Sequence, residues 1–238
     1  MGRRSLLLAG AAFPATAYGQ CVTDAPEAAS TNLLFPSVLS GPNWLPVNLV
    51  LGGSVTLPDG TTSTSALLSA TDTANTVRLF YRAGTTVTAS TAYVVSVYFK
   101  ASPKNAYIQI DSAGAANVCI AYFDLTAGTG VVGADLAGSI TGKYASIVSA
   151  GNGWYRCSFA LMNGVGNTSL QVAVGPCTVV STSGDNRAYV GVVGQGVYAW
   201  GAQVEQGTFP TSYIPTTSGS VTRSAGLPFM SPTLKCRR

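Results

Sequence analysis

The sequence predicts an all-β protein folded as an antiparallel β-sandwich, with roughly nine to eleven strands at the spacing typical of sandwiches and barrels. Charged residues make up only 9% of the 238 residues, and runs rich in Glu, Lys and Leu, which exposed helix faces need, are absent. Gly, Ser, Thr, Val and Ala dominate instead, which favours pleated strands joined by tight turns. A chain of this length can form one all-β domain around one sizeable core.

The clearest predicted strand is 93–100, in which apolar side chains alternate with Ser96, Tyr98 and Lys100. One face of this strand is expected in the core, and the other is expected to be half-exposed. Alternation and apolar runs predict the remaining strands at 66–68, 77–82, 106–111, 118–125, 154–161, 170–174 and 189–205. A Pro-Asp-Gly turn at 58–60, a Gly-rich loop at 126–142 and a polar loop at 181–187 separate several of them.

The two ends of the chain differ from its body. Residues 1–21 resemble an export signal, because Arg3 and Arg4 precede an apolar stretch and an Ala-Thr-Ala cleavage pattern at 15–17. The alternative is an uncleaved arm that docks on a partner. The apolar stretch is shorter than the roughly 20 residues that cross a bilayer, so no membrane span is expected. We predict a linker at 22–31, the sandwich domain at 32–222 and an extended basic tail at 223–238.

The net charge of +4 comes from the ends of the chain. Six of the thirteen cations lie outside residues 5–222, namely Arg3, Arg4, Arg223, Lys235, Arg237 and Arg238. The other seven are outnumbered by the nine acids, all of which lie in the body. Because a nucleic-acid groove needs clustered cations on the folded body, the sequence excludes nucleic acid as a partner.

The chain contains no histidine, which excludes His-based triads, Cys-His pairs, the usual zinc sites and His acid–base catalysis. Hydrolysis of glycans by paired carboxylates needs only two acids, and Asp111 and Asp124 are the first pair to test for it. The acids are scattered without a paired motif, so we predict no enzyme, no metal site and no cofactor. Structural calcium through oxygen ligands such as Asp59 or Asp185 stays unassigned, because no EF-hand-like spacing occurs.

The five cysteines, an odd number, leave at least one unpaired within the chain. Cys119 and Cys157 lie in apolar, strand-like runs, which favours buried thiols. A single disulfide among Cys119, Cys157 and Cys177 is the alternative.

Three stretches in order carry a resemblance to a known family. They are Phe-Asp-Leu at 123–125 before a Gly/Thr loop, Asn-Gly-Trp-Tyr-Arg at 152–156, and YAWGAQVE at 198–205 followed by TSYIPT at 211–216. Together they resemble a lectin-like β-sandwich domain of bacteriophage tail, head-spike and fibre proteins. The resemblance covers about residues 32–225, whereas the signal-like N-terminus departs from it.

The resemblance implies a jelly roll akin to carbohydrate-binding modules, which contacts glycans on a host cell. Its partners would be a cell-surface glycan and other virion or fibre subunits, with a homotrimer natural for a fibre although no heptads occur. The location implied is the virion surface or the cell exterior. The alternative is a structural virion or secreted protein that oligomerises or docks through its basic termini without binding glycan.

Aromatic rings contact the C–H faces of sugars, and polar side chains bind their hydroxyls. On this basis the candidate glycan-binding residues are Tyr98, Lys100, Tyr107 and Gln109, expected on neighbouring strands, together with Arg78 and Trp44. For Trp44 a core anchor is the alternative, and all six residues would otherwise cover an ordinary sheet face. The motif residues Trp154, Trp200, Tyr213 and Pro215 are expected to close the core.

Overall fold

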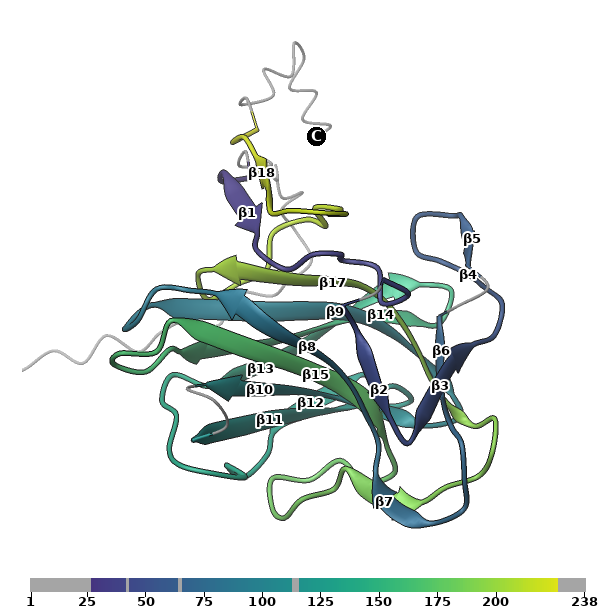
Figure 1. Ribbon diagram of the computed structural model, residues 1–238. Coiled ribbons are helices and arrows are strands. Elements are labelled where there is room, and N and C mark those ends of the chain that lie inside the picture. The colour runs from purple at the N-terminus through teal and green to yellow at the C-terminus, as the bar shows by residue number, and fades with distance from the viewer. Residues whose placement is uncertain (1–26, 42, 64–65, 113–115, 227–238) are drawn as a thin grey trace, which may run out of the picture.

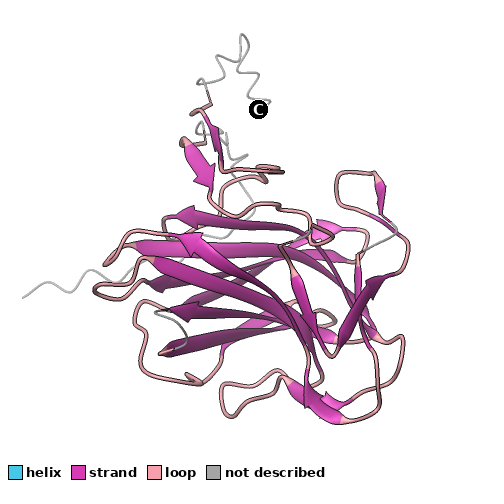
Figure 2. Cartoon of the chain, in the orientation of Figure 1, coloured by secondary structure: helices cyan, strands magenta, loops and turns pink. Residues whose placement is uncertain are grey.

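The computed structural model describes residues 27–41, 43–63, 66–112 and 116–226. The predicted export signal at 1–21 therefore lies outside the described residues, as does the tail beyond Gly226. The described part contains strands and loops and no helix, as Figure 2 shows. The prediction of an all-β fold is confirmed. No segment of the described chain is a helix long and apolar enough to cross a bilayer.

Two six-stranded antiparallel sheets form the body of the molecule (Figure 1). We name them the β10 sheet and the β9 sheet after one of their inner strands. In paired order the β10 sheet contains β12 (Thr129–Val132), β11 (Asn117–Asp124), β10 (Asn105–Ser112), β15 (Ser169–Cys177), β8 (Leu79–Thr86) and β2 (Leu45–Val47). The β9 sheet contains β13 (Tyr144–Gly151), β14 (Trp154–Met162), β9 (Ala92–Ser102), β17 (Gly196–Gln206), β6 (Leu67–Ala70) and β3 (Leu49–Gly52).

The inner faces of the two sheets enclose one apolar core, which makes the body a β-sandwich. The β10 sheet contributes Ile108, Ile110, Phe123, Val172 and Val174, among others, and the β9 sheet contributes Val95, Val97, Phe99, Phe159 and Val204. The alternation predicted for residues 93–100 is confirmed, because every second side chain from Tyr93 to Phe99 lies in this core.

Three two-stranded sheets lie outside the sandwich. They pair β1 (Ser30–Asn32) with β18 (Val221–Arg223), β7 (Asn75–Val77) with β16 (Ala188–Val190), and β4 (Val55–Thr56) with β5 (Thr62–Ser63). Figure 1 shows the β1–β18 ribbon projecting from the body. Within the described residues the strands number eighteen, more than predicted, because strands of two to four residues are too short to alternate visibly.

Three boundaries differ from the predictions. Residues 189–205 form two strands, because a turn in which Gln195 N donates to Val192 O separates β16 from β17. The predicted Gly-rich loop contains β12, which pairs with the edge of β11. The predicted linker and tail both contribute to the β1–β18 ribbon. Ser30, predicted as linker, pairs with Arg223, predicted as tail, and Thr31 pairs with Thr222.

Strand β17 contains a bulge that explains the Trp-Gly-Ala-Gln motif. Trp200 pairs with Tyr98 and Gln203 with Ser96, so three steps on β17 oppose two on β9. Gly201 adopts a φ of 65°, a left-handed conformation that glycine accepts without strain. The bulge shifts the alternation by one residue, so Trp200 and Gln203 both lie on the outer face of the sheet.

The three described cysteines are free and buried, which favours the prediction of buried thiols over that of a disulfide. Burial raises the pKa of Cys119 to about 12, and it raises the pKa values of Cys157 and Cys177 as well. These thiols therefore stay protonated at neutral pH and serve as small apolar side chains.

Replacement of Gly201 by Ala is expected to lower the free energy of unfolding by about 1–2 kcal/mol, because an L-residue is strained at this φ. Its Cβ would also lie 3.1 Å from Tyr98 Cδ2 and 3.3 Å from Tyr213 Cε2. Urea unfolding measures the change. Gly52→Ala is the control, since Gly52 lies in a strand with ordinary φ and nothing within 4 Å of a Cβ. Equal stability of the two variants would show that the bulge does not require glycine.

Candidate functional site

Two of the predicted site residues are structural. Trp44 is buried, stacks on Phe80 with ring centroids 5.7 Å apart, and donates from Nε1 to Pro36 O. It is a core anchor, the alternative noted for it. Arg78 is fully buried, and its guanidinium donates to the carbonyls of Thr76 and Tyr189 and pairs with Asp72 at 2.6 Å. Arg78 thus fastens the β7–β16 ribbon to the body.

Tyr107 and Gln109 lie on the outer face of the β10 sheet, where other segments cover them. Tyr107 is fully buried and donates from its hydroxyl to Arg78 O, and burial is the main reason why its pKa is raised. Gln109 is 4% exposed and bonds to Asp111 and to Arg187 from the polar loop at 181–187. Neither side chain is accessible to a glycan as the chain is folded here.

Tyr98 and Lys100 lie on the outer face of the β9 sheet, and both are partly exposed. The expectation that these two share neighbouring strands with Tyr107 and Gln109 is wrong. Strands β9 and β10 follow each other in the chain but belong to opposite sheets, so their outer faces point away from each other. The sandwich fold thus splits the predicted site and leaves the β9-sheet half accessible.

The suggested hydrolase pair does not come together. Asp111 pairs with Val118 of β11, whereas Asp124 lies six residues further along that strand. At about 3.3 Å per residue the two carboxylates are roughly 20 Å apart, beyond the separation that paired-carboxylate hydrolysis uses. Desolvation raises the pKa of Asp111, although the amides of Gln109 and Gln171 and the charge of Arg187 oppose the shift.

The two aspartates considered for calcium bind protein donors instead. Asp59 accepts from the backbone and hydroxyl of Thr61, and both oxygens of Asp185 bond to Arg187, which lowers the pKa of Asp185. In the part of the chain that the structure describes, no three Cys, Asp or Glu side chains gather as metal ligands would.

Strand register aligns two rows of side chains across the outer face of the β9 sheet. The first row contains Val148, Arg156, Tyr98 and Trp200, and the second contains Ser146, Ser158, Ser96 and Gln203. Their partners at alternate positions, such as Val97 and Cys157, point into the core. Side chains from four strands thus lie side by side on this face, where Ser96, Ser158 and Gln203 are buried under other parts of the chain.

A groove of about 390 Å³ lies over the β13–β14 side of these rows. Tyr98, Arg156, Ser146 and Ser158 are among the residues that line it, and Phe209 and Pro210 form a wall from the segment after β17. The side chains of Phe209 and Val148 are 71% and 63% exposed. The groove therefore combines accessible apolar walls with hydroxyl groups and one guanidinium.

Arg156 is the charged residue of the groove lining. Its guanidinium lies over the Tyr98 ring, 5.5 Å from the centroid, and its Nη2 donates to Ser96 Oγ at 3.0 Å. A cation above an aromatic ring is held in place by the ring quadrupole. Tyr98 and Ser96 thereby fix the guanidinium in the groove.

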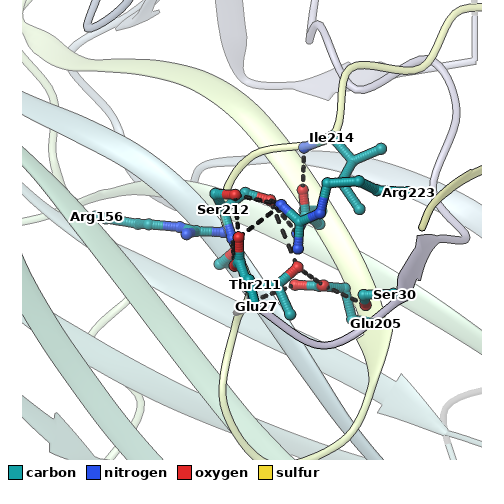
Figure 3. Close-up of polar contacts among 10 residues, drawn as sticks. Glu27, Ser30, Arg156, Glu205, Thr211, Ser212, Ile214 and Arg223 are labelled. Carbon is teal, nitrogen blue, oxygen red and sulfur yellow. Dashed lines mark hydrogen bonds and ion pairs between the residues drawn. The ribbon is translucent and has the colours of Figure 1, made fainter. Parts of the chain in front are cut away.

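A polar network, drawn together with Arg156 in Figure 3, positions the wall of the groove. Glu205, which is 1% exposed, accepts a hydrogen bond from Ser30 Oγ and two from the backbone and hydroxyl of Thr211. Gln203 accepts from Ile214 N at 2.8 Å. These bonds fix the chain immediately after Phe209 and Pro210. The motif residues Gln203 and Glu205 therefore hold the segment that forms the wall of the groove in place.

Glu27 adds a second carboxylate to this network from the N-terminal side. It accepts from the backbone and hydroxyl of Ser212 and pairs with Arg223 at 2.9 Å. Burial alone would raise the pKa of Glu27, but the bonds from Ser212 and the charge of Arg223 outweigh it and lower the pKa from 4.5. The contribution of Glu27 to stability is thus complete above that value and is lost as pH falls through the lowered pKa.

The motif residues Trp154 and Trp200 are buried, as expected, but in a small apolar cluster of their own, against which Tyr213 packs, rather than in the main core. The Trp200 ring lies 4.6 Å from that of Tyr213 and 5.4 Å from that of Tyr98, centroid to centroid. Trp154 is buried beneath the β4–β5 hairpin and donates to Thr56 O. Trp200, Tyr213 and Pro215 line a second groove of about 550 Å³.

Sequence reasoning missed Arg156 and Phe209 as site residues. The alternation of 154–161 could have indicated Arg156, since it faces away from Cys157, but its row with Tyr98 depends on strand pairing. Nothing in the sequence around Phe209 distinguishes a groove wall from an ordinary loop.

No model of a known protein family matches the chain, and no curated protein matches it. The resemblance to phage lectin-like domains therefore stays a prediction from the sequence.

Glu205→Gln is expected to lower the free energy of unfolding by about 1.5–3 kcal/mol, because hydrogen bonds to a buried charged acceptor are lost. An amide keeps one acceptor oxygen and places donors beside Thr211 N–H. Urea unfolding measures stability, and hydrogen exchange at the Thr211 amide measures loosening of the wall. Glu27→Gln is the matched control on the exposed side, expected to cost less than about 1 kcal/mol. An unchanged Thr211 exchange rate in Glu205→Gln would contradict the role of Glu205.

Proposed function

We propose that this chain is a non-enzymatic carbohydrate-binding module of jelly-roll type, and that it binds glycan in the groove on the outer face of the β9 sheet. The observation that carries the proposal is the composition of that groove. It combines the exposed ring of Phe209 and the partly exposed ring of Tyr98 with the accessible hydroxyls of Ser146 and Ser149 and the guanidinium of Arg156.

Sugars are amphipathic in the way that this groove requires. Their C–H faces pack on aromatic rings, and their hydroxyls exchange hydrogen bonds with serine and arginine. The exposed ring of Phe209 has no packing role that explains its position, since 71% of its surface contacts solvent. The network around Glu205 and Glu27 fixes this ring without covering it, so binding would require little reorganisation.

The opposite face of the sandwich supports the choice of this groove. There the loops at 133–138 and 178–190 cover the β10 sheet, and Tyr122 accepts from Asn186 N while Arg187 caps Gln109. Aromatic and amide groups on that side are already used within the chain. On the β9 sheet, Tyr98 and Ser146 stay partly exposed and Ser149 is exposed, all three in the lining of the groove.

The sequence resemblance suggests in which kind of protein and at which location the module would act. The three family-like stretches favour a module of a phage-like spike or fibre, at the virion surface or outside the cell, that recognises a host-surface glycan beside other fibre subunits. Two of these stretches supply Arg156, which lines the proposed groove, and Trp200 and Tyr213, which pack against Tyr98. They also supply Glu205, which fixes Thr211 just after the groove wall.

Phe209→Ala is expected to weaken glycan binding roughly tenfold, because one aromatic contact with the sugar is removed. Affinity is measured on a glycan array and then by calorimetry with the best glycan. The free energy of unfolding is expected to change by less than about 0.5 kcal/mol, since an exposed side chain is removed. Val190→Ala is the control, an exposed residue on the β7–β16 ribbon that is expected to change neither quantity.

Tyr98→Ala should weaken binding at least as much, because Tyr98 also supports Arg156. Binding that survives both substitutions would move the site away from this groove. Failure to bind any glycan would overturn the carbohydrate proposal and favour a structural protein that docks through the β1–β18 end.

A further inference from the structure

The groove has an uncompensated positive charge. Its lining contains Arg156 and neither Asp nor Glu. The two carboxylates of the nearby network are already used, Glu205 by Ser30 and Thr211 and Glu27 by Ser212 and Arg223. No described carboxylate forms an ion pair with Arg156. Its positive charge is therefore available to pair with an anionic group of a ligand in the groove.

Arg156 differs in this from most arginines of the described chain. Arg78, Arg187 and Arg223 each pair with a carboxylate, at 2.6, 2.5 and 2.9 Å. A guanidinium that serves only to support the fold is ordinarily paired in this way when it is partly buried, since burial of an unpaired charge is costly.

The hydrogen-bond inventory of Arg156 is incomplete as well. A guanidinium carries five N–H donors. One N–H of Nη2 goes to Ser96 Oγ, while Nε is buried without an acceptor and Nη1 has no acceptor among the described residues. The outer edge formed by Nη1 and the second N–H of Nη2 therefore remains available, and the Tyr98 ring holds it in a fixed orientation.

We propose that the groove selects an acidic glycan, with the carboxylate of a sugar residue bound by the outer edge of Arg156. This inference rests on the proposed carbohydrate function and specifies its ligand class. The planar guanidinium edge matches the two oxygens of a carboxylate, and a single fixed cation balances a single negative charge. Ser146, which is partly exposed, and Ser149, which is exposed, line the same groove and offer hydroxyls to the remaining groups of the sugar.

The test presents the full chain with four acidic polysaccharides, each beside its methyl ester, which keeps the sugar backbone and removes the charge. The probes are polygalacturonate, alginate, hyaluronate and polysialate, on an array that also carries neutral, sulfated and phosphorylated glycans. We expect the strongest binding to a carboxylate-bearing glycan and a loss of about tenfold or more on its esterification.

Arg156→Gln is expected to lower affinity for the acidic glycan by the same factor and to leave affinity for its methyl ester unchanged. Arg156→Lys keeps the charge but loses the planar edge, so its affinity should fall between those of the wild type and Arg156→Gln. Urea unfolding checks that both variants fold. Because esterification changes the ligand alone, the comparison stands even if a variant fails to fold.

The possible failures separate the two proposals. A best ligand that is neutral, sulfated or phosphorylated, or a carboxylated one that tolerates esterification, would overturn the acidic-sugar inference and leave carbohydrate binding in place. Absence of binding to every glycan would overturn both.

Discussion

The bulge at Gly201 is the constraint on which the outer face of the β9 sheet depends. By adding one residue to β17, it turns Trp200 and Gln203 to the same side while Ala199 and Ala202 stay in the core. Without it, either the core alternation or the outer row would be out of register, because a one-residue slip reverses every side chain that follows. The absence of a side chain at Gly201 also leaves space for Tyr98 and Tyr213 to pack against the backbone.

The groove arises where rigid and irregular parts of the chain meet. Its floor is a set of side chains from β13, β14 and β9, whose spacing is fixed by the ladder of the sheet. Its wall is a loop, and loops need side-chain hydrogen bonds because they lack a ladder. Buried Glu205 supplies them, which explains why a carboxylate stands at the end of an otherwise apolar strand. The residues that stabilise this loop therefore also shape the groove.

The sequence supported the fold class and most of the long strands, because those depend on local alternation and turn residues. It did not support the grouping of the site, because Tyr98 and Tyr107 sit on consecutive strands that the chain places in opposite sheets. Arg78 and Gln109 appeared as polar residues on a strand face, and only the loops that fold over them make them internal. Arg156 becomes a site residue through its partners across β9 and after β17, which are distant in sequence.

The β1–β18 ribbon brings the two ends of the folded chain together, since Gly226 N donates to Glu27 O at 3.0 Å. A domain whose two ends are adjacent can be attached to a larger assembly at a single point. A force applied at both ends would open the ribbon one hydrogen bond at a time, beginning with the Glu27 and Arg223 contacts. The ladder of the sandwich would bear load only after those bonds had opened. The ribbon would therefore open before the sandwich under such a force, and the groove would keep its shape while it did so.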